Sequence, residues 1–173
     1  MRTEKQRELM EGFLSTLEPE RSAVYRELIL HLSSLGYDPK KQRSALVFTC
    51  PWHNKQIAKT GFDRKGQPFF ALRFSACRGY SQRFEKIVED VVSGKGYREA
   101  RCMANEEDFC KGAPAERVYV HEMPDGEKRY HCGAKALAIP GLCPADVPEI
   151  KRLMEEEHRF LMEHEAKAEP SPA

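Results

Sequence analysis

Four of the six cysteines in this 173-residue chain fall within one segment of the second half. They are Cys102, Cys110, Cys132 and Cys143, with 7, 21 and 10 residues between successive members. Thiolates are preferred ligands of zinc, which takes four protein ligands in a tetrahedral structural site. We therefore predict that these four cysteines form a structural zinc site that orders the segment around them.

The spacing leaves other interpretations open. An iron–sulfur cluster is the second choice of cofactor, because the close cysteine spacings typical of such clusters are missing. The cysteines could instead be unrelated buried thiols, since free cysteine is among the most buried residue types. A site with three protein ligands and a bound water would indicate a metal-dependent enzyme, and a pair that cycles between thiol and disulfide would indicate a redox protein. His121 and His131 are candidate replacement ligands.

A second pair, Cys50 and His53, lies in the sequence Cys-Pro-Trp-His. Cysteine and histidine at this spacing could bind a metal or act as nucleophile and base. The sequence identifies no third group to support either role, so the simpler interpretation is a strand end with a packing tryptophan. Cys77 is expected to be a core thiol. We therefore predict no catalytic residue.

The middle of the chain is strongly basic. Residues 40–101 carry 14 basic and 5 acidic residues, a net charge of +9, whereas the whole chain has a net charge of +1. Cations interleaved with aromatic rings suit phosphate contacts and base stacking. We predict an anionic partner, either a small molecule or a nucleic acid, bound by Arg73, Lys59, Arg78 and Trp52. An ordinary solvated basic surface is the simpler alternative. Arg73 interrupts an apolar strand, so it must face solvent, a partner carboxylate or a ligand.

The elements that position these residues follow from apolar spacing and turn residues. Residues 3–17 and 19–35 each carry an apolar stripe at helical spacing and are predicted to form an antiparallel pair of helices. Residues 44–50, 56–60 and 69–75 are β-prone runs separated by Pro, Gly and Asp. Short strands separated by turn residues favour an antiparallel meander.

The second half is predicted to combine two helices with a hairpin. One helix should start at Ser81. Residues 123–126, Met-Pro-Asp-Gly, lie between two strand-like runs and predict a turn, because Pro fixes φ, Asp bonds to nearby backbone and Gly accepts positive φ. The last helix should be capped by Asp146 and carry His158 as a half-buried packing residue. Residues 155–157, all Glu, are expected on its solvated face.

Together these elements predict an α+β fold with an N-terminal helical pair, a small antiparallel sheet with a packed helix, a cysteine-bearing β-hairpin and a C-terminal helix. Residues 1–97 should form the α+β domain, residues 98–166 the hairpin and closing helix packed on it, and residues 167–173 a flexible tail. No apolar run approaches the ~20 residues of a membrane helix, so we expect no membrane partner. The charged N-terminal residues differ from a secretory signal, and we expect a cytoplasmic protein with reduced thiols.

Three stretches of the middle segment carry a resemblance to a known group. They are Lys55-Gln-Ile-Ala-Lys-Thr60, Pro68-Phe-Phe-Ala-Leu-Arg-Phe-Ser75 and the helix that follows from Tyr80. In these stretches, and in the order helix, strands, helix, the chain resembles the small bacterial YdhG-like α+β domains of unknown function. The likeness covers the middle third to half of the chain and implies an α+β fold. It implies no catalytic residues, and the cysteine-rich extension departs from the group.

Overall fold

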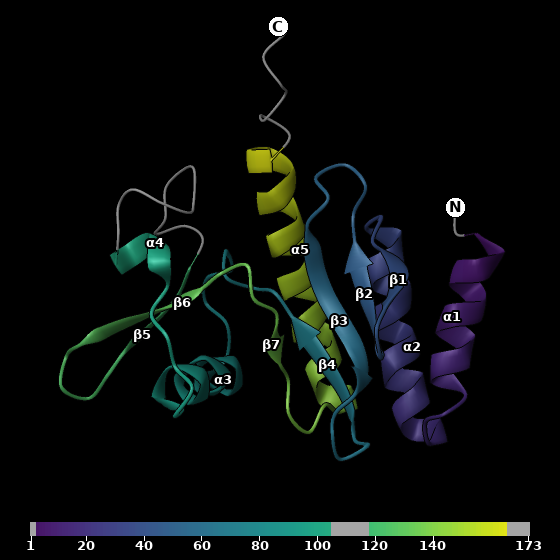
Figure 1. Cartoon of the computed structure of the whole chain (residues 1–173), viewed down its shortest axis with the longest axis horizontal. Coiled ribbons are helices and arrows are strands. Elements are labelled where there is room, and N and C mark those ends of the chain that lie inside the picture. The colour runs from purple at the N-terminus through teal and green to yellow at the C-terminus, as the bar shows by residue number, and fades with distance from the viewer. Residues whose placement is uncertain (1–2, 105–117, 166–173) are drawn as a thin grey trace, which may run out of the picture.

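The structure is a computed structural model that describes residues 3–104 and 118–165. The helices are α1 (Glu4–Leu14), α2 (Pro19–Ser34), α3 (Gln82–Ser93), α4 (Arg101–Ala104) and α5 (Val147–Glu165). The strands are β1 (Asp38–Gln42), β2 (Ala45–Thr49), β3 (Gln56–Phe62), β4 (Pro68–Leu72), β5 (Val118–Glu122), β6 (Lys128–Cys132) and β7 (Leu137–Ala138). The first four strands and β7 form an antiparallel sheet in the order β1-β2-β3-β4-β7, and β5 pairs with β6 (Figure 1). The predicted α+β class is confirmed.

The N-terminal helical pair has clear end signals. At the start of α1, the Thr3 hydroxyl accepts from the Gln6 N–H and the Gln6 side chain accepts from the Thr3 N–H, which satisfies two otherwise unpaired backbone donors. At the end of α2, Gly36 has φ +85°. The next N–H, that of Tyr37, donates to the Leu32 carbonyl at 2.9 Å. This left-handed cap ends the helix and turns the Tyr37 side chain into the core.

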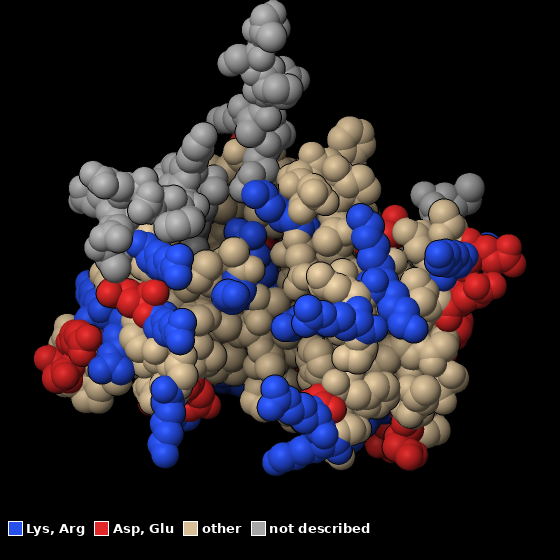
Figure 2. Space-filling model, in the orientation of Figure 1, with Lys and Arg blue, Asp and Glu red and all other residues tan. Residues whose placement is uncertain are grey.

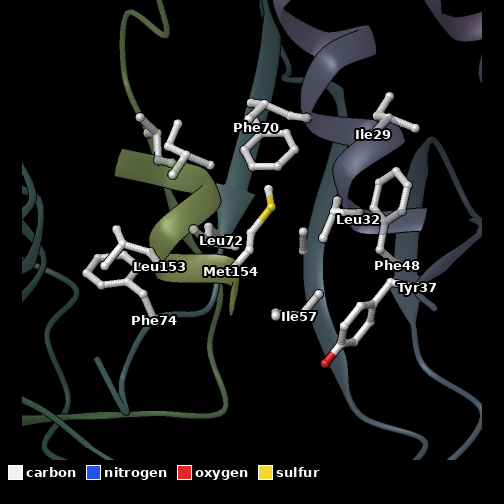
Figure 3. Packing of buried hydrophobic residues seen from close by; sticks show 14 of the residues in the cluster. Ile29, Leu32, Tyr37, Phe48, Ile57, Phe70, Leu72, Phe74, Leu153 and Met154 are labelled. Carbon is white, nitrogen blue, oxygen red and sulfur yellow. The ribbon is translucent and has the colours of Figure 1, made fainter. Parts of the chain in front are cut away.

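One face of the large sheet packs on α2 and α5, which lie behind it in Figure 1. Figure 3 shows Met154 of α5 beside Phe70 and Leu72 of β4, and Ile29 of α2 beside the ring of Phe48 of β2. Phe74, directly after β4, makes edge-on contacts with the rings of Phe84 and Tyr119, and so joins the sheet to α3 and β5. Burial of each large apolar side chain contributes about 1.5–3 kcal/mol.

Helix α3 and the hairpin β5-β6 lie beside the β7 edge of the sheet (Figure 1). Arg83 of α3 forms a two-pronged ion pair with Asp146, with Nε–Oδ1 and Nη2–Oδ2 distances of 2.6 and 2.9 Å. The hairpin turn is as predicted: Gly126 has φ +85° and its N–H donates to the Met123 carbonyl. Ser81 occupies the N-cap position of α3, but its side chain does not cap the helix as expected. Its N–H and hydroxyl donate instead to the Glu149 carboxylate of α5.

The three predicted strands of the middle segment are observed as β2, β3 and β4, but two further strands were not predicted. β1 has the polar sequence Asp-Pro-Lys-Lys-Gln, and it forms because all five residues pair with β2. Its proline is tolerated because β1 is the edge strand of the sheet. β7 is only two residues long. Among residues 3–104 and 118–165, no helix has both the length and the apolar character needed to cross a membrane.

Candidate functional site

The face of the large sheet opposite α2 and α5 is open. The strand register places Lys40, Val47, Lys59, Ala71 and Ala138 in one row across the five strands, and residues directly opposite in a ladder share a face. Val47 and Ala71 of this row stand outside the main core cluster, although both are buried. The long aliphatic stems of neighbouring lysines can cover small apolar residues of this kind and so bury them. The face looks toward the viewer in Figure 1.

The open face is basic. Within the described residues, no carboxylate lies within ion-pair distance of Lys40 or Lys59. The Lys59 ammonium lies 5.9 Å from the centre of the Phe69 ring, a cation–π contact that keeps an aromatic side chain beside the charge. Figure 2 shows Lys and Arg side chains lying across this face, whereas Asp and Glu gather mainly towards its margins. Lys40 and Lys59 therefore present two separate positive charges on this face. The other residues of the row have small apolar side chains.

The four residues predicted to bind an anion do not gather at one place. Lys59 lies in the row on the open face. Trp52 is 82% exposed in the loop between β2 and β3. Arg78 is exposed in the loop after β4, where one guanidinium nitrogen donates to the Ser75 and Cys77 carbonyls at 3.2 and 3.1 Å. Arg73 is buried.

Arg73 makes an ion pair with Glu157 of α5, with 2.6 Å between Nε and Oε1. The Nε–H does not point along this contact, so it is an ion pair rather than an aligned hydrogen bond. Of the three environments that the sequence allowed for Arg73, the structure shows the partner carboxylate. The expectation that Glu157 lies on a solvated face is wrong, because its side chain is 0% exposed. Its spacing from Leu153 and Leu161 on the apolar stripe is the signal that could have shown its burial.

Glu157 also orders the chain that follows β4. Its Oε2 accepts from the Ala76 N–H at 2.8 Å. Burial raises the pKa of Glu157, while Arg73 and the Ala76 N–H oppose the shift. The thiol of Cys77 donates to the Leu153 carbonyl, and burial raises its pKa, which confirms a core thiol. These contacts fix the path of residues 73–77 against α5.

A buried tyrosine ties the same stretch to the hairpin. The Tyr119 hydroxyl accepts from the Phe74 N–H at 3.0 Å and donates to the Lys135 carbonyl at 2.9 Å. Ser75 donates to the Gly133 carbonyl at 3.0 Å. Sequence reasoning did not identify this network, because its partners are 16–58 residues apart along the chain.

His53 takes part in a second buried network. Its Nδ1 accepts from the Lys55 N–H, so in the neutral ring the proton is on Nε2. Nε2 lies 3.1 Å from the Tyr37 hydroxyl, which in turn lies 3.2 Å from Nδ1 of His158. Burial lowers the pKa of His158, which favours a neutral ring that accepts the tyrosine proton. His53 therefore donates to Tyr37 and Tyr37 to His158, and the half-buried position predicted for His158 is confirmed.

This network bears on the Cys50–His53 pair. Both ring nitrogens of His53 face partners other than the thiol, namely a backbone N–H and a phenol. Cys50 itself is fully buried, and a Cβ built on Gly36 would lie 3.9 Å from its sulfur. The arrangement favours a packed strand end over a nucleophile with its base. The expectation that the tryptophan of this sequence packs there is wrong, because Trp52 is 82% exposed.

The four predicted zinc ligands are only partly within the described chain. Cys102 of α4 and Cys132 of β6 pack in one small cluster with Ala100 and Val118, apart from the main core. Cys143 is exposed and precedes the 3₁₀ turn before α5. Cys110 lies outside the described residues. Residues 3–104 and 118–165 contain no group of three or more His, Cys, Asp or Glu placed to hold a metal ion, so the zinc site stays a prediction.

Comparison with known proteins gave no relative: no family model, no curated protein and no solved structure matches the chain. The resemblance of the middle segment to the YdhG-like domains therefore stays an expectation.

Proposed function

We propose that this protein binds an anionic polymer, single-stranded nucleic acid, through the open face of its large sheet. The observation that carries the proposal is the row in which Lys40 and Lys59 lie across the sheet without a carboxylate partner in the described chain. A charge left unpaired on a flat face is available to a phosphate. The Phe69 ring beside Lys59 and the exposed Trp52 add aromatic surface for bases.

Physical chemistry links these features to binding. Lysines that contact phosphates release condensed counterions, which makes affinity fall with salt. Aromatic side chains such as Trp52 stack on bases at about 1–3 kcal/mol each, largely independent of sequence. Binding of this kind recognises the backbone and the π-faces of the bases, so the proposal predicts affinity without strong sequence preference.

The experiment is a salt titration of binding to short fluorescent single-stranded DNA and RNA, followed by anisotropy. The variant Lys40→Gln/Lys59→Gln removes both charges of the row. Because each phosphate contact on a single strand adds about 0.7 to the slope of log K against log salt, the slope should become shallower by about 1.4. The matched control, Lys95→Gln/Lys128→Gln, removes two exposed charges away from the sheet and should behave like the wild type.

Either of two results would reject the proposal. Wild-type binding that is absent, or that does not depend on salt, shows that the row contacts no phosphate. An equal loss in the control variant shows that net charge alone, rather than the open face, holds the oligonucleotide.

A structural zinc site is a second proposal, favoured by the packing of Cys102 and Cys132 in one small cluster. It includes a reducing, cytoplasmic setting, in which cysteines stay as thiols rather than disulfides. Elemental analysis of protein purified without chelator, repeated on Cys132→Ser, tests it. One tightly held zinc that Cys132→Ser loses supports the site. Unchanged metal content in the variant rejects it, and loss of two thiols on mild oxidation without metal indicates redox chemistry instead.

A further inference from the structure

A groove of about 440 Å³ lies between α1 and the adjoining ends of β2 and β3. Its volume falls within the range of small-molecule sites, about 300–1,000 Å³. Four large apolar side chains line it: Leu9 and Phe13 from α1, Leu46 from β2 and Phe62 from β3. Leu9 and Phe62 are only partly buried, so apolar surface is left uncovered in the groove. An alkyl chain placed there would be removed from water.

Gly12 keeps this groove open. It lies inside α1 and lines the groove, and a Cβ built on it meets nothing within 4 Å. Its φ is not positive, and no close neighbour requires the absence of a side chain. Glycine inside a helix is less stable than alanine, so packing and backbone geometry give no reason for it here. A larger side chain at this position would fill the groove.

The groove has cations at its rim. Lys5 and Lys41 line it, together with one acidic residue, Glu8. An adjoining hollow shares Lys5 and Lys41 and adds Lys40. In the described chain none of the three lysines forms an ion pair. A groove lined by apolar side chains and by lysines is complementary to a molecule with an alkyl chain and one anionic group.

We propose that this groove binds a free fatty acid, with its alkyl chain along Leu9, Phe13 and Phe62 and its carboxylate at Lys5 and Lys41. The proposal is independent of nucleic-acid binding, because neither Lys5 nor Gly12 belongs to the open sheet face.

The test measures binding of decanoate by isothermal titration calorimetry, below its micelle concentration. Wild-type protein should bind one decanoate. Gly12→Leu should weaken binding at least tenfold, because the leucine side chain occupies the groove. The matched variant Gly12→Ala should bind within about twofold of wild type and have a higher Tm, because alanine leaves the groove open and is the better helix former.

A second variant tests the head group. Lys5→Gln/Lys41→Gln should weaken decanoate several-fold and leave binding of the neutral 1-decanol unchanged. Both lysines are exposed, so this variant decides the question even if Gly12→Leu fails to fold. Failure of the wild type to bind decanoate overturns the proposal. So does a folded Gly12→Leu variant with wild-type affinity, or a lysine variant that binds decanoate as the wild type does.

Discussion

Removal of the two charges of the Arg73–Glu157 pair should have unequal consequences. Both side chains are almost excluded from solvent, with exposed fractions of 7% and 0%. An arginine keeps its proton at any pH at which the fold persists, whereas a carboxylate can take one up. Glu157→Leu therefore leaves a buried cation with no means of neutralising it. Arg73→Met leaves a carboxyl group that can become neutral.

The expected magnitude follows from the interactions that each substitution removes. Breaking a buried ion pair from one side costs about 3–5 kcal/mol of unfolding free energy. Glu157→Leu also removes the acceptor of the Ala76 N–H, and a buried donor without a partner costs about 1–3 kcal/mol. The double variant Arg73→Met/Glu157→Leu removes both charges and should recover most of the loss, keeping only this second cost. The two substitutions should therefore be strongly non-additive.

The pH dependence has opposite signs in the two single variants. Burial raises the pKa of Glu157 in the folded protein, so its contribution to stability is fully present below the unfolded pKa and is lost as pH rises through the folded pKa. Arg73 opposes that shift, so Arg73→Met raises the pKa of Glu157 further. The gap in unfolding free energy between wild type and Arg73→Met should widen as pH rises above about 4.5. The gap between wild type and Glu157→Leu should narrow over the same window.

Urea denaturation followed by far-UV circular dichroism at pH 5 and pH 8 measures these differences. As a control, Lys151→Met breaks the exposed pair between α5 and Glu27 of α2, and should cost less than about 1 kcal/mol. A double variant as unstable as the sum of its parts would refute the reasoning, because the charges would then be uncoupled. Equal pH slopes for the two single variants would also refute it.

Three further predictions concern tyrosine and cysteine side chains. Tyr119→Phe removes a hydroxyl that accepts from the Phe74 N–H and donates to a backbone carbonyl, and should lower the unfolding free energy by about 1–3 kcal/mol in urea denaturation. Tyr37→Phe removes the hydroxyl that donates to the neutral ring of His158, so NMR titration should show the pKa of His158 raised relative to wild type. In folded protein freed of metal by a chelator, iodoacetamide should modify the exposed Cys143 rapidly and spare Cys77, whose pKa burial raises; equal labelling by mass spectrometry would contradict this placement.

The parts of the fold that sequence predicted best are those set by neighbouring residues. Gly36 ends α2 because a left-handed residue is needed there, and Gly126 closes the hairpin for the same reason. The apolar stripe of α2 identified its buried face in the same way. In each case the physical cause lies within a few residues of its effect, so a single sequence contains it.

The parts that sequence missed depend on distant partners. β1 has a polar composition and exists because β2 supplies its hydrogen bonds. Glu157 can be buried because it pairs with the buried Arg73, and 83 residues separate the two in the chain. A buried charge in an apolar strand predicts that a partner exists but does not identify it. The predicted zinc site also depends on residues far apart in the chain, and one of its four ligands, Cys110, lies outside the described residues.

The net charge of the basic segment, residues 40–101, overstates the positive charge that a binding partner would contact. Arg73 is neutralised in the core, Arg83 is paired with Asp146, and Lys86 lies within ion-pair distance of two carboxylates of its own helix. The carboxylates beside Lys86 are already included in the net charge of +9, whereas Glu157 and Asp146 lie outside the segment and lower it to +7. The row on the open face contributes only two strand lysines. Two phosphate contacts give a shallow salt dependence. A steep dependence, of the size that many contacts produce, would mean that residues outside this row carry the binding.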